Sequence, residues 1–267
     1  MSKGVILFAH NSPAYNYYKM AEFTAQRIEY FLQLPVTLIT DEASLPENPK
    51  YNFDNIILEE PNKTNKREFG LWYNKDRFQA YHYSPYEQTI VLDVDYLVNS
   101  DKLLNLLKYD TDFMCHNKTN FLTDLNNEQE LISPYSFETL WATVIYFRKS
   151  TLAKNIFDIL SMVQNNYQHY QYIHRFLDQM YRNDYALTLA YRIANGHMID
   201  KSNFIPWNLL HIPKTVQLLS NSKEKHNTKF SILFEVKKNN KTKTEYIEVN
   251  NVDFHVMNKN DFSQLYE

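Results

Sequence analysis

Glycine is scarce in this sequence, which has only three in 267 residues. A glycine-rich loop that wraps phosphate groups with backbone N–H donors is therefore excluded. Any phosphate bound by this chain needs a metal ion and cationic side chains instead. Cysteine is scarcer still, because Cys115 is the single one and has no partner for an intramolecular disulfide. Since it lies in an apolar run, we expect a buried and unreactive thiol.

Long apolar runs are also missing. No stretch approaches the ~18 apolar residues of a membrane-spanning helix, and residues 5–9 are too few for a signal peptide. We therefore expect a cytoplasmic protein without a membrane partner, and nothing in the sequence implies an obligate protein partner. The net charge of −3 gives no general attraction to nucleic acid. Hydrophobic residues make up 44% of the chain, enough for one domain over residues 1–267.

Short apolar runs alternate with longer segments of helical periodicity. Residues 5–8, 36–40 and 53–58 are typical of strands, and a helix is expected over residues 14–34. Because one long helix and one proline-rich loop separate these strands, we expect an α/β fold with parallel strands. Further helices are expected over residues 72–83, 101–107, 151–163, 167–181 and 184–194.

The most informative stretch is residues 89–98, in which an apolar run leads into Asp93 and Asp95 and then becomes apolar again. In open α/β sheets, ligands bind beyond the carboxyl ends of the strands. Carboxylate oxygens at such a place suit Mg²⁺ or Mn²⁺, which also take oxygens from phosphates. The stretch therefore predicts a metal site that binds a diphosphate.

The spacing of the two aspartates is not specific by itself. With fifteen Asp among 267 residues, about one Asp-x-Asp is expected by chance. A second pair, Asp110 and Asp112, follows a predicted helix end, and we interpret it as an exposed turn. An exposed turn is also the alternative for Asp93 and Asp95, but the apolar residues on both sides favour a strand end.

Near the C-terminal end of the sequence, His255 and Lys259 are candidates for the same site. An imidazole is a suitable ligand for Mn²⁺ beside carboxylates, and Lys259 could contact phosphate oxygens that the metal leaves uncompensated. The alternative is a solvated surface histidine. If the metal interpretation holds, residues 252–259 return to the acidic pair.

A family resemblance supports this interpretation. Residues 92–98, Leu-Asp-Val-Asp-Tyr-Leu-Val, resemble the Leu-Asp-Ala-Asp-x-Leu-Val segment of GT-A-fold glycosyltransferases, especially the glycogenin-like group. That group also has a late His-x-x-Gly-x-x-Lys segment, which the stretch from His255 to Lys259 resembles, although it is shorter and has no glycine. The resemblance covers most of residues 4–200 in element order, together with this late stretch. It implies a GT-A (Rossmann-like) α/β fold with a mixed, mostly parallel sheet flanked by helices.

The resemblance also implies ligands and roles. It makes His255 the third ligand of Mn²⁺ or Mg²⁺ and implies a nucleotide-sugar donor, with a UDP-linked sugar as the first candidate. The donor-binding residues it implies are Ala9, Asn11, Arg77, Val94 and Lys259, with Ala9 to Asn11 near the base and ribose. It places Asp184 near the sugar, as a base if the reaction inverts or as an orienting group if it retains. The alternatives are a turn residue for Asn11, a solvated charge for Arg77 and a helix cap for Asp184.

A basic hairpin, residues 222–250, bears on the acceptor. Between residues 223 and 243 there are seven Lys against two Glu, with Lys237, Lys238 and Lys241 at the expected tip. Lysines of this kind bind polyanions such as DNA through phosphate contacts. Small, Lys-rich and Gly-poor GT-A proteins resemble tailed-phage enzymes that glycosylate or arabinosylate 5-hydroxymethylcytosine, which implies a double-stranded DNA acceptor in the host-cell cytoplasm. A saccharide or protein acceptor, a metal-dependent nucleotidyltransferase and a non-catalytic binding protein are the alternatives.

Overall fold

The computed structural model describes residues 1–60, 66–67, 70–71, 76–123, 130–176, 180–222, 224, 226–238 and 241–266. Its central element is a six-stranded sheet in the order β3-β2-β1-β6-β10-β8. The strands are β1 (Lys3–Phe8), β2 (Val36–Thr40), β3 (Asn55–Leu58), β6 (Gln88–Leu92), β8 (Phe113–His116) and β10 (Trp141–Arg148). The first four strands in this order are parallel, whereas β10 is antiparallel to β6 and to β8. The expected mixed, mostly parallel sheet is therefore confirmed.

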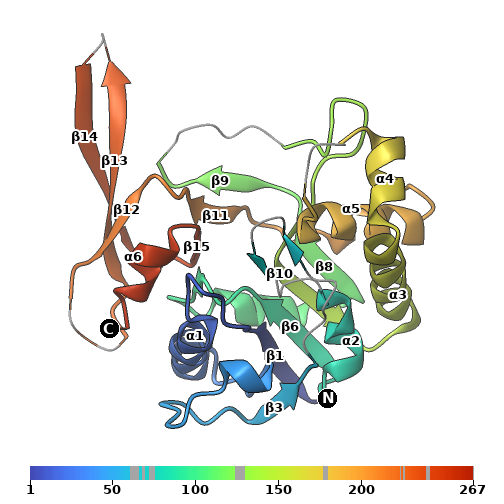
Figure 1. The fold of residues 1–267 in the computed structure, drawn as a ribbon, viewed down its shortest axis with the longest axis horizontal. Coiled ribbons are helices and arrows are strands. Elements are labelled where there is room, and N and C mark those ends of the chain that lie inside the picture. The colour runs from blue at the N-terminus through green and yellow to red at the C-terminus, as the bar shows by residue number, and fades with distance from the viewer. Residues whose placement is uncertain are drawn as a thin grey trace.

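Helices cover both faces of this sheet (Figure 1). The helices are α1 (Tyr17–Leu32), α2 (Ala80–Tyr83), α3 (Thr151–Asn165), α4 (Tyr167–His174), α5 (Asn183–Ala194) and α6 (Lys259–Ser263). The side chains of β1 alternate, as a two-residue period requires. Val5 and Leu7 pack in one core with α1, whereas Ile6 and Phe8 pack in a second core with α3 and α5.

Three expected helices differ from the structure. The one predicted over residues 72–83 begins, in its described part, as the 3₁₀ turn η2 (Arg77–Gln79) before α2. Residues 72–75 lie outside the described part of the chain. The one predicted over residues 167–181 is too long, because Arg175 adopts a left-handed conformation that ends α4. The segment after Asp101 is a 3₁₀ helix, η3 (Lys102–Lys108), rather than an α-helix.

A second sheet, which the sequence did not predict, has the order β7-β15-β11-β9. Its strands are short: β7 (Tyr96–Leu97), β9 (Thr119–Phe121), β11 (Leu209–Ile212) and β15 (Phe254–Val256). Its buried residues Leu209, Ile212, Phe254 and Val256 join the same core as α1. This sheet brings a strand from near the C-terminus beside the end of β6.

The expected hairpin is confirmed as β13 (Lys229–Lys238) and β14 (Lys241–Asn250), which pair with β12 (Gln217–Ser220). It extends away from the rest of the molecule (Figure 1). The remaining elements are β4 (Lys66–Arg67), β5 (Gly70–Leu71), η1 (Glu42–Ser44) and η4 (Lys201–Asn203). Among the described helices, none combines the length and the apolar character that crossing a membrane requires.

Candidate metal centre

The acidic pair lies where β6 ends, as the sequence predicts. All five residues of β6 are buried. The chain then makes a tight turn, in which the N–H of Tyr96 donates to the carbonyl of Asp93 at 3.0 Å. The N–H of Asp93 donates in turn to the carbonyl of Thr143 on β10, also at 3.0 Å. The turn thus presents Asp93 and Asp95 at the carboxyl edge of the central sheet, where parallel sheets bind ligands.

Buried polar side chains of helix α1 hydrogen-bond to the backbone of this turn and of the segment that follows β7. The hydroxyl of Thr24 donates to the carbonyl of Val94 at 2.6 Å, and Arg27 Nε donates to the carbonyl of Val98 at 2.7 Å. Burial lowers the pKa of Arg27 to about 10, although Asp253 acts in the opposite direction. At this pKa the guanidinium stays charged near neutral pH, so it remains a strong donor to the carbonyls that it holds.

Strand pairing brings His255 to the acidic pair. β15 is antiparallel to β7, with His255 opposite Tyr96, and the N–H of Val256 donates to the carbonyl of Asp95 at 2.9 Å. A second link lies just before β15, where the N–H of Asn99 donates to Asp253 at 2.6 Å. The contact between a histidine and an aspartate 160 positions apart therefore rests on backbone hydrogen bonds rather than on the side chains alone.

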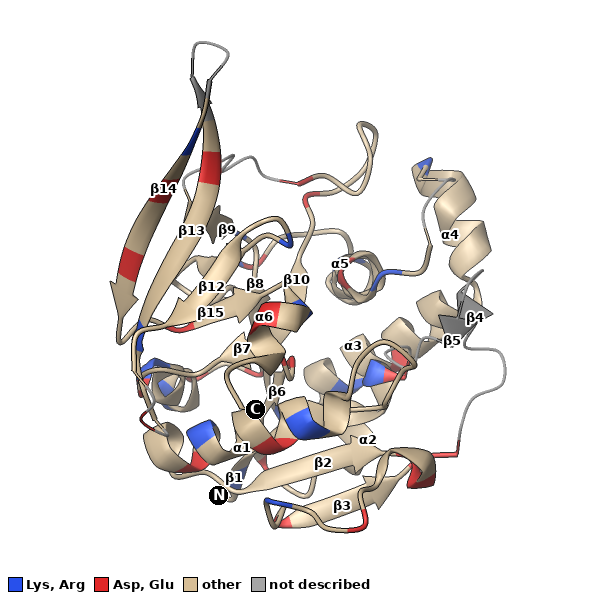
Figure 2. Ribbon diagram, turned by 60° about the vertical axis from the view of Figure 1, so that its left-hand side comes forward, with Lys and Arg blue, Asp and Glu red and all other residues tan. Residues whose placement is uncertain are grey.

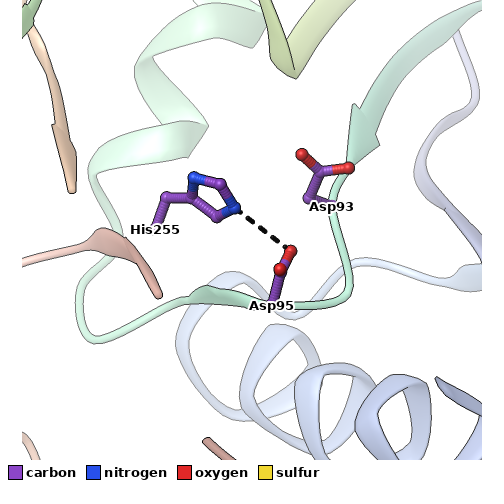
Figure 3. Close-up of side chains that lie close together, drawn as sticks. All are labelled: Asp93, Asp95 and His255. Atoms are coloured by element: carbon purple, nitrogen blue, oxygen red, sulfur yellow. Dashed lines mark ion pairs between the residues drawn. The ribbon is translucent and has the colours of Figure 1, made fainter. Parts of the chain in front are cut away.

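Asp93, Asp95 and His255 form a compact cluster (Figure 3). One ligand atom from each lies within 4.8 Å of the others, and His255 Nε2 is 3.3 Å from Asp95 Oδ1. Asp95 is buried, and the other two side chains are largely buried. Two carboxylates and one imidazole fit the preferences of Mn²⁺ and accommodate Mg²⁺. The donor set that the sequence predicted is thus brought together in one place.

Two cations lie against the cluster. The ammonium of Lys259 contacts Asp95 Oδ2, and the guanidinium of Arg77 contacts Asp93 Oδ1. Burial alone would raise the pKa of Asp95, but Lys259 and His255 together hold that pKa well below its usual range. Burial likewise opposes the charge of Lys259, but Asp95 raises the pKa of the ammonium above its ordinary value. The carboxylate and the ammonium are therefore both charged across the physiological range.

Asp184 is connected to the cluster through the start of β10. Its Oδ1 accepts a hydrogen bond from the N–H of Ala142 at 2.9 Å, and its Oδ2 lies 3.4 Å from Arg182. Arg77 donates to the carbonyl of the same Ala142 at 2.8 Å. Burial lowers the pKa of Arg77, and the nearby carboxylates of Asp184 and Asp95 oppose that effect. Asp184 thus faces the same edge of the sheet as the cluster.

The residues expected at the nucleoside have structural contacts of their own. Ala9 is buried at the end of β1, and its carbonyl accepts a hydrogen bond from Thr40 at 2.6 Å. The Asn11 side chain accepts from the N–H of Tyr18 at 3.0 Å and donates to the carbonyl of Ser44 at 3.3 Å. Asn11 therefore shapes the turn between β1 and α1, and its role toward a ligand stays a prediction.

Three further polar residues lie at the same edge: His10 belongs to the stretch from Ala9 to Asn11, whereas the sequence analysis did not single out Asp41 and Glu59. His10 follows β1, and its Nε2 is 3.3 Å from Glu59, which follows β3. Asp41 follows β2, is 3% exposed, and its Oδ1 has no hydrogen-bond partner among the described residues. Asp41 and Glu59 each come directly after a predicted strand, which was the signal that could have identified them.

Neither the described part of the hairpin nor the second acidic pair contributes a residue to the cluster. The side chains of Lys237, Lys238 and Lys241 lie outside the described part of the chain. Along the described hairpin, acidic and basic residues are mixed (Figure 2). Asp110 has a side chain that is 98% exposed and pairs with Arg148 at 2.9 Å, consistent with an exposed turn.

Comparisons with known proteins give similarities of structure only. No family model and no curated protein matches the chain. The glycosyltransferase GlyE of Streptococcus pneumoniae TIGR4 is similar with a TM-score of 0.44 and 10% identity over 76% of this chain and 45% of GlyE. The galactosyltransferase LgtC in complex with donor and acceptor sugar analogs has a TM-score of 0.46 and 14% identity over 70% of this chain and 69% of its own. An active-site mutant of LgtC has a TM-score of 0.48 and 15% identity over 70% of this chain and 69% of its own. The chain spans less than half the length of GlyE.

Proposed function

We propose that this protein is a metal-dependent glycosyltransferase that moves a sugar from a nucleoside-diphosphate sugar, UDP-linked in the first instance, to a hydroxyl acceptor. The observation that carries the proposal is the convergence of Asp93, Asp95 and His255 at the carboxyl edge of the sheet, with Lys259 and Arg77 against them. Two anionic ligands and two adjacent cations match a leaving group that is both metal-bound and strongly negative.

Asp93, Asp95 and His255 would hold Mn²⁺ or Mg²⁺, which when bound supplies charge neutralisation to the departing diphosphate. Lys259 and His255 contact different oxygens of the Asp95 carboxylate: the imidazole lies at Oδ1 and the ammonium at Oδ2. Lys259 is 24% exposed, so its ammonium can leave Asp95 and contact a phosphate oxygen. Arg77 is more deeply buried, and its ion pair with Asp93 holds that carboxylate in place.

Asp184 is proposed to act on the transferred sugar or its acceptor. Both of its oxygens already accept hydrogen bonds, one from the N–H of Ala142 and the other from Arg182. A carboxylate held in this way is well suited to orient a sugar hydroxyl, which is the role expected in a retaining reaction. In an inverting reaction it would instead take the proton of the acceptor hydroxyl.

For the acceptor we propose 5-hydroxymethylcytosine in double-stranded DNA. Support comes from the lysines between residues 223 and 243 and from the resemblance to phage enzymes. Binding through lysine–phosphate contacts falls steeply with salt, because counterions are released from the DNA. Replacing Lys237, Lys238 and Lys241 together by Gln should therefore flatten the salt dependence of DNA binding. If the parent protein binds neither hydroxymethylated nor plain DNA, the acceptor is a saccharide or a protein.

Hydrolysis of a nucleotide sugar in the absence of an acceptor tests the reaction itself. A panel of nucleotide sugars is incubated with Mn²⁺, and release of nucleoside diphosphate is measured. Asp95→Asn should abolish release, whereas Asp110→Asn is a matched control from the exposed Asp-x-Asp and should keep the parent rate. Equal rates for the two variants would remove the acidic pair from the reaction. Release of pyrophosphate from nucleoside triphosphates would assign a nucleotidyltransferase instead.

A further inference from the structure

His211 is a buried histidine next to the candidate metal-binding cluster of Asp93, Asp95 and His255. It lies on β11, is 2% exposed, and neither ring nitrogen has a hydrogen-bond partner among the described residues. Burying a polar group without a partner destabilises the folded state, whereas an apolar side chain of similar shape would not. We therefore expect a ring nitrogen of His211 to have a hydrogen-bond partner, since an apolar ring could otherwise fill this position at a lower cost.

The neighbouring strand offers that partner. β11 and β15 are parallel, and His211 is in register with His255. Their ring centroids are 6.5 Å apart with an angle of 46° between the rings. His255 Nε2 faces Asp95, whereas its other nitrogen, Nδ1, lies on the side away from Asp95 (Figure 3). That Nδ1 is buried and also has no partner among the described residues.

A histidine that binds a metal through one nitrogen almost always donates its other N–H to a fixed acceptor, which sets the tautomer and the orientation of the ring. We propose that His211 provides this acceptor through one bridging water, which takes the Nδ1–H of His255 and donates to a ring nitrogen of His211, and so keeps Nε2 directed at the two aspartates. His211 is then a positioning residue for the metal centre. The inference depends on the metal centre of the proposed function, but not on which sugar or acceptor the protein uses.

The surroundings of His211 support a positioning role. Its ring packs against Phe121, with centroids 4.1 Å apart, and edge-on against Trp141, with centroids 5.6 Å apart. These two large rings restrict rotation of the imidazole, which a fixed acceptor requires. His211 is also not a member of the group whose ligand atoms lie within 4.8 Å of one another. It is therefore placed to support a ligand rather than to be one.

The test is the affinity of the protein for Mn²⁺ alone, measured from the electron paramagnetic resonance signal of free Mn²⁺. His211→Phe keeps a ring of similar size but removes both nitrogens, and it should weaken Mn²⁺ binding by about 10- to 100-fold. His211→Asn restores a hydrogen-bonding group and should recover part of the loss. His116→Phe is the matched control: His116 is a buried histidine whose Nδ1 bonds to the Trp207 carbonyl at 3.0 Å. It should keep the parent affinity.

Thermal unfolding without metal separates positioning from packing. His211→Phe should unfold close to the parent temperature, because the phenyl ring keeps the packing against Phe121 and Trp141 and no hydrogen bond to another described residue is lost. Parent-like Mn²⁺ affinity in His211→Phe would overturn the inference, provided that His255→Ala loses binding. Electron spin echo spectra of the bound Mn²⁺ should show one coordinated imidazole, and two would make His211 a ligand instead.

Failure of this inference differs from failure of the proposed function. If the parent shows no saturable Mn²⁺ binding, the metal centre is wrong and the role of His211 is wrong with it. If the parent binds Mn²⁺ and His211→Phe weakens it, but no nucleotide sugar is turned over, the positioning role stands and the glycosyltransferase assignment is lost.

Discussion

Replacing Lys259 by Met should strengthen Mn²⁺ binding in the absence of nucleotide and weaken nucleotide binding in its presence. In the structure the Lys259 ammonium contacts Asp95 Oδ2, an atom of the carboxylate that would bind the metal. A metal ion and an ammonium cannot share one carboxylate without repelling each other. In the proposed function, Lys259 thus competes with the metal for Asp95 before a diphosphate binds and contacts the phosphates afterwards.

The size of the effect follows from the geometry. A divalent ion held by Asp95 and an ammonium on the same carboxylate would repel each other by several kcal/mol at an effective dielectric constant of about 20. The Lys259 side chain is 24% exposed, so it can avoid most of this repulsion by turning into solvent. What remains is the lost ion pair with Asp95, about 1–2 kcal/mol for a partly exposed pair. Lys259→Met should therefore bind Mn²⁺ about 5- to 30-fold more tightly.

Titration calorimetry measures both halves of this prediction. Mn²⁺ is titrated into the nucleotide-free parent and variant, and UDP is then titrated into each protein saturated with Mn²⁺. The variant should lose about 10- to 150-fold in UDP affinity, because a charge-assisted hydrogen bond to phosphate contributes about 1.5–3 kcal/mol. Lys102→Met, which removes a lysine from η3 rather than from the cluster, is the control and should change neither value. Weaker Mn²⁺ binding in Lys259→Met would refute the competition argument.

Three further predictions concern the buried groups around the site. Arg77→Lys should lower the rate of nucleotide-sugar hydrolysis, measured as diphosphate release, by about 10-fold or more. The reason is that one ammonium cannot hold both Asp93 and the Ala142 carbonyl. Arg27→Met should lower the free energy of unfolding by about 3–5 kcal/mol in urea titrations, since it strips the Val98 carbonyl of its buried donor. Burial lowers the pKa of His116 to about 3, so the folded ring stays neutral while the unfolded ring protonates below about pH 6.5. Stability should then fall by about 2 kcal/mol from pH 7 to pH 5, and His116→Asn should remove that part of the dependence.

The parts of the fold that the sequence predicted are those in which a local pattern determines the element. The buried runs of β1, β2 and β6 and the apolar face of α3 need no distant partner to be recognised. The same holds for the acidic pair, because the apolar run of β6 comes directly before Asp93. Pattern alone also distinguished this pair from Asp110 and Asp112, and the 98% exposure of the Asp110 side chain agrees with that choice.

The rest of the site depends on strands too short to carry a period. β7 has two residues and β15 has three, and neither can be recognised without the other. Chemistry could therefore select His255 as a ligand candidate, but only the pairing of β7 with β15 explains how it reaches Asp95. The same limit hid His211, which is unremarkable in the sequence and becomes informative only when β11 places it beside His255. Residues that support a ligand are in general set by register between distant strands, so they are the last part of a metal centre that a sequence alone can predict.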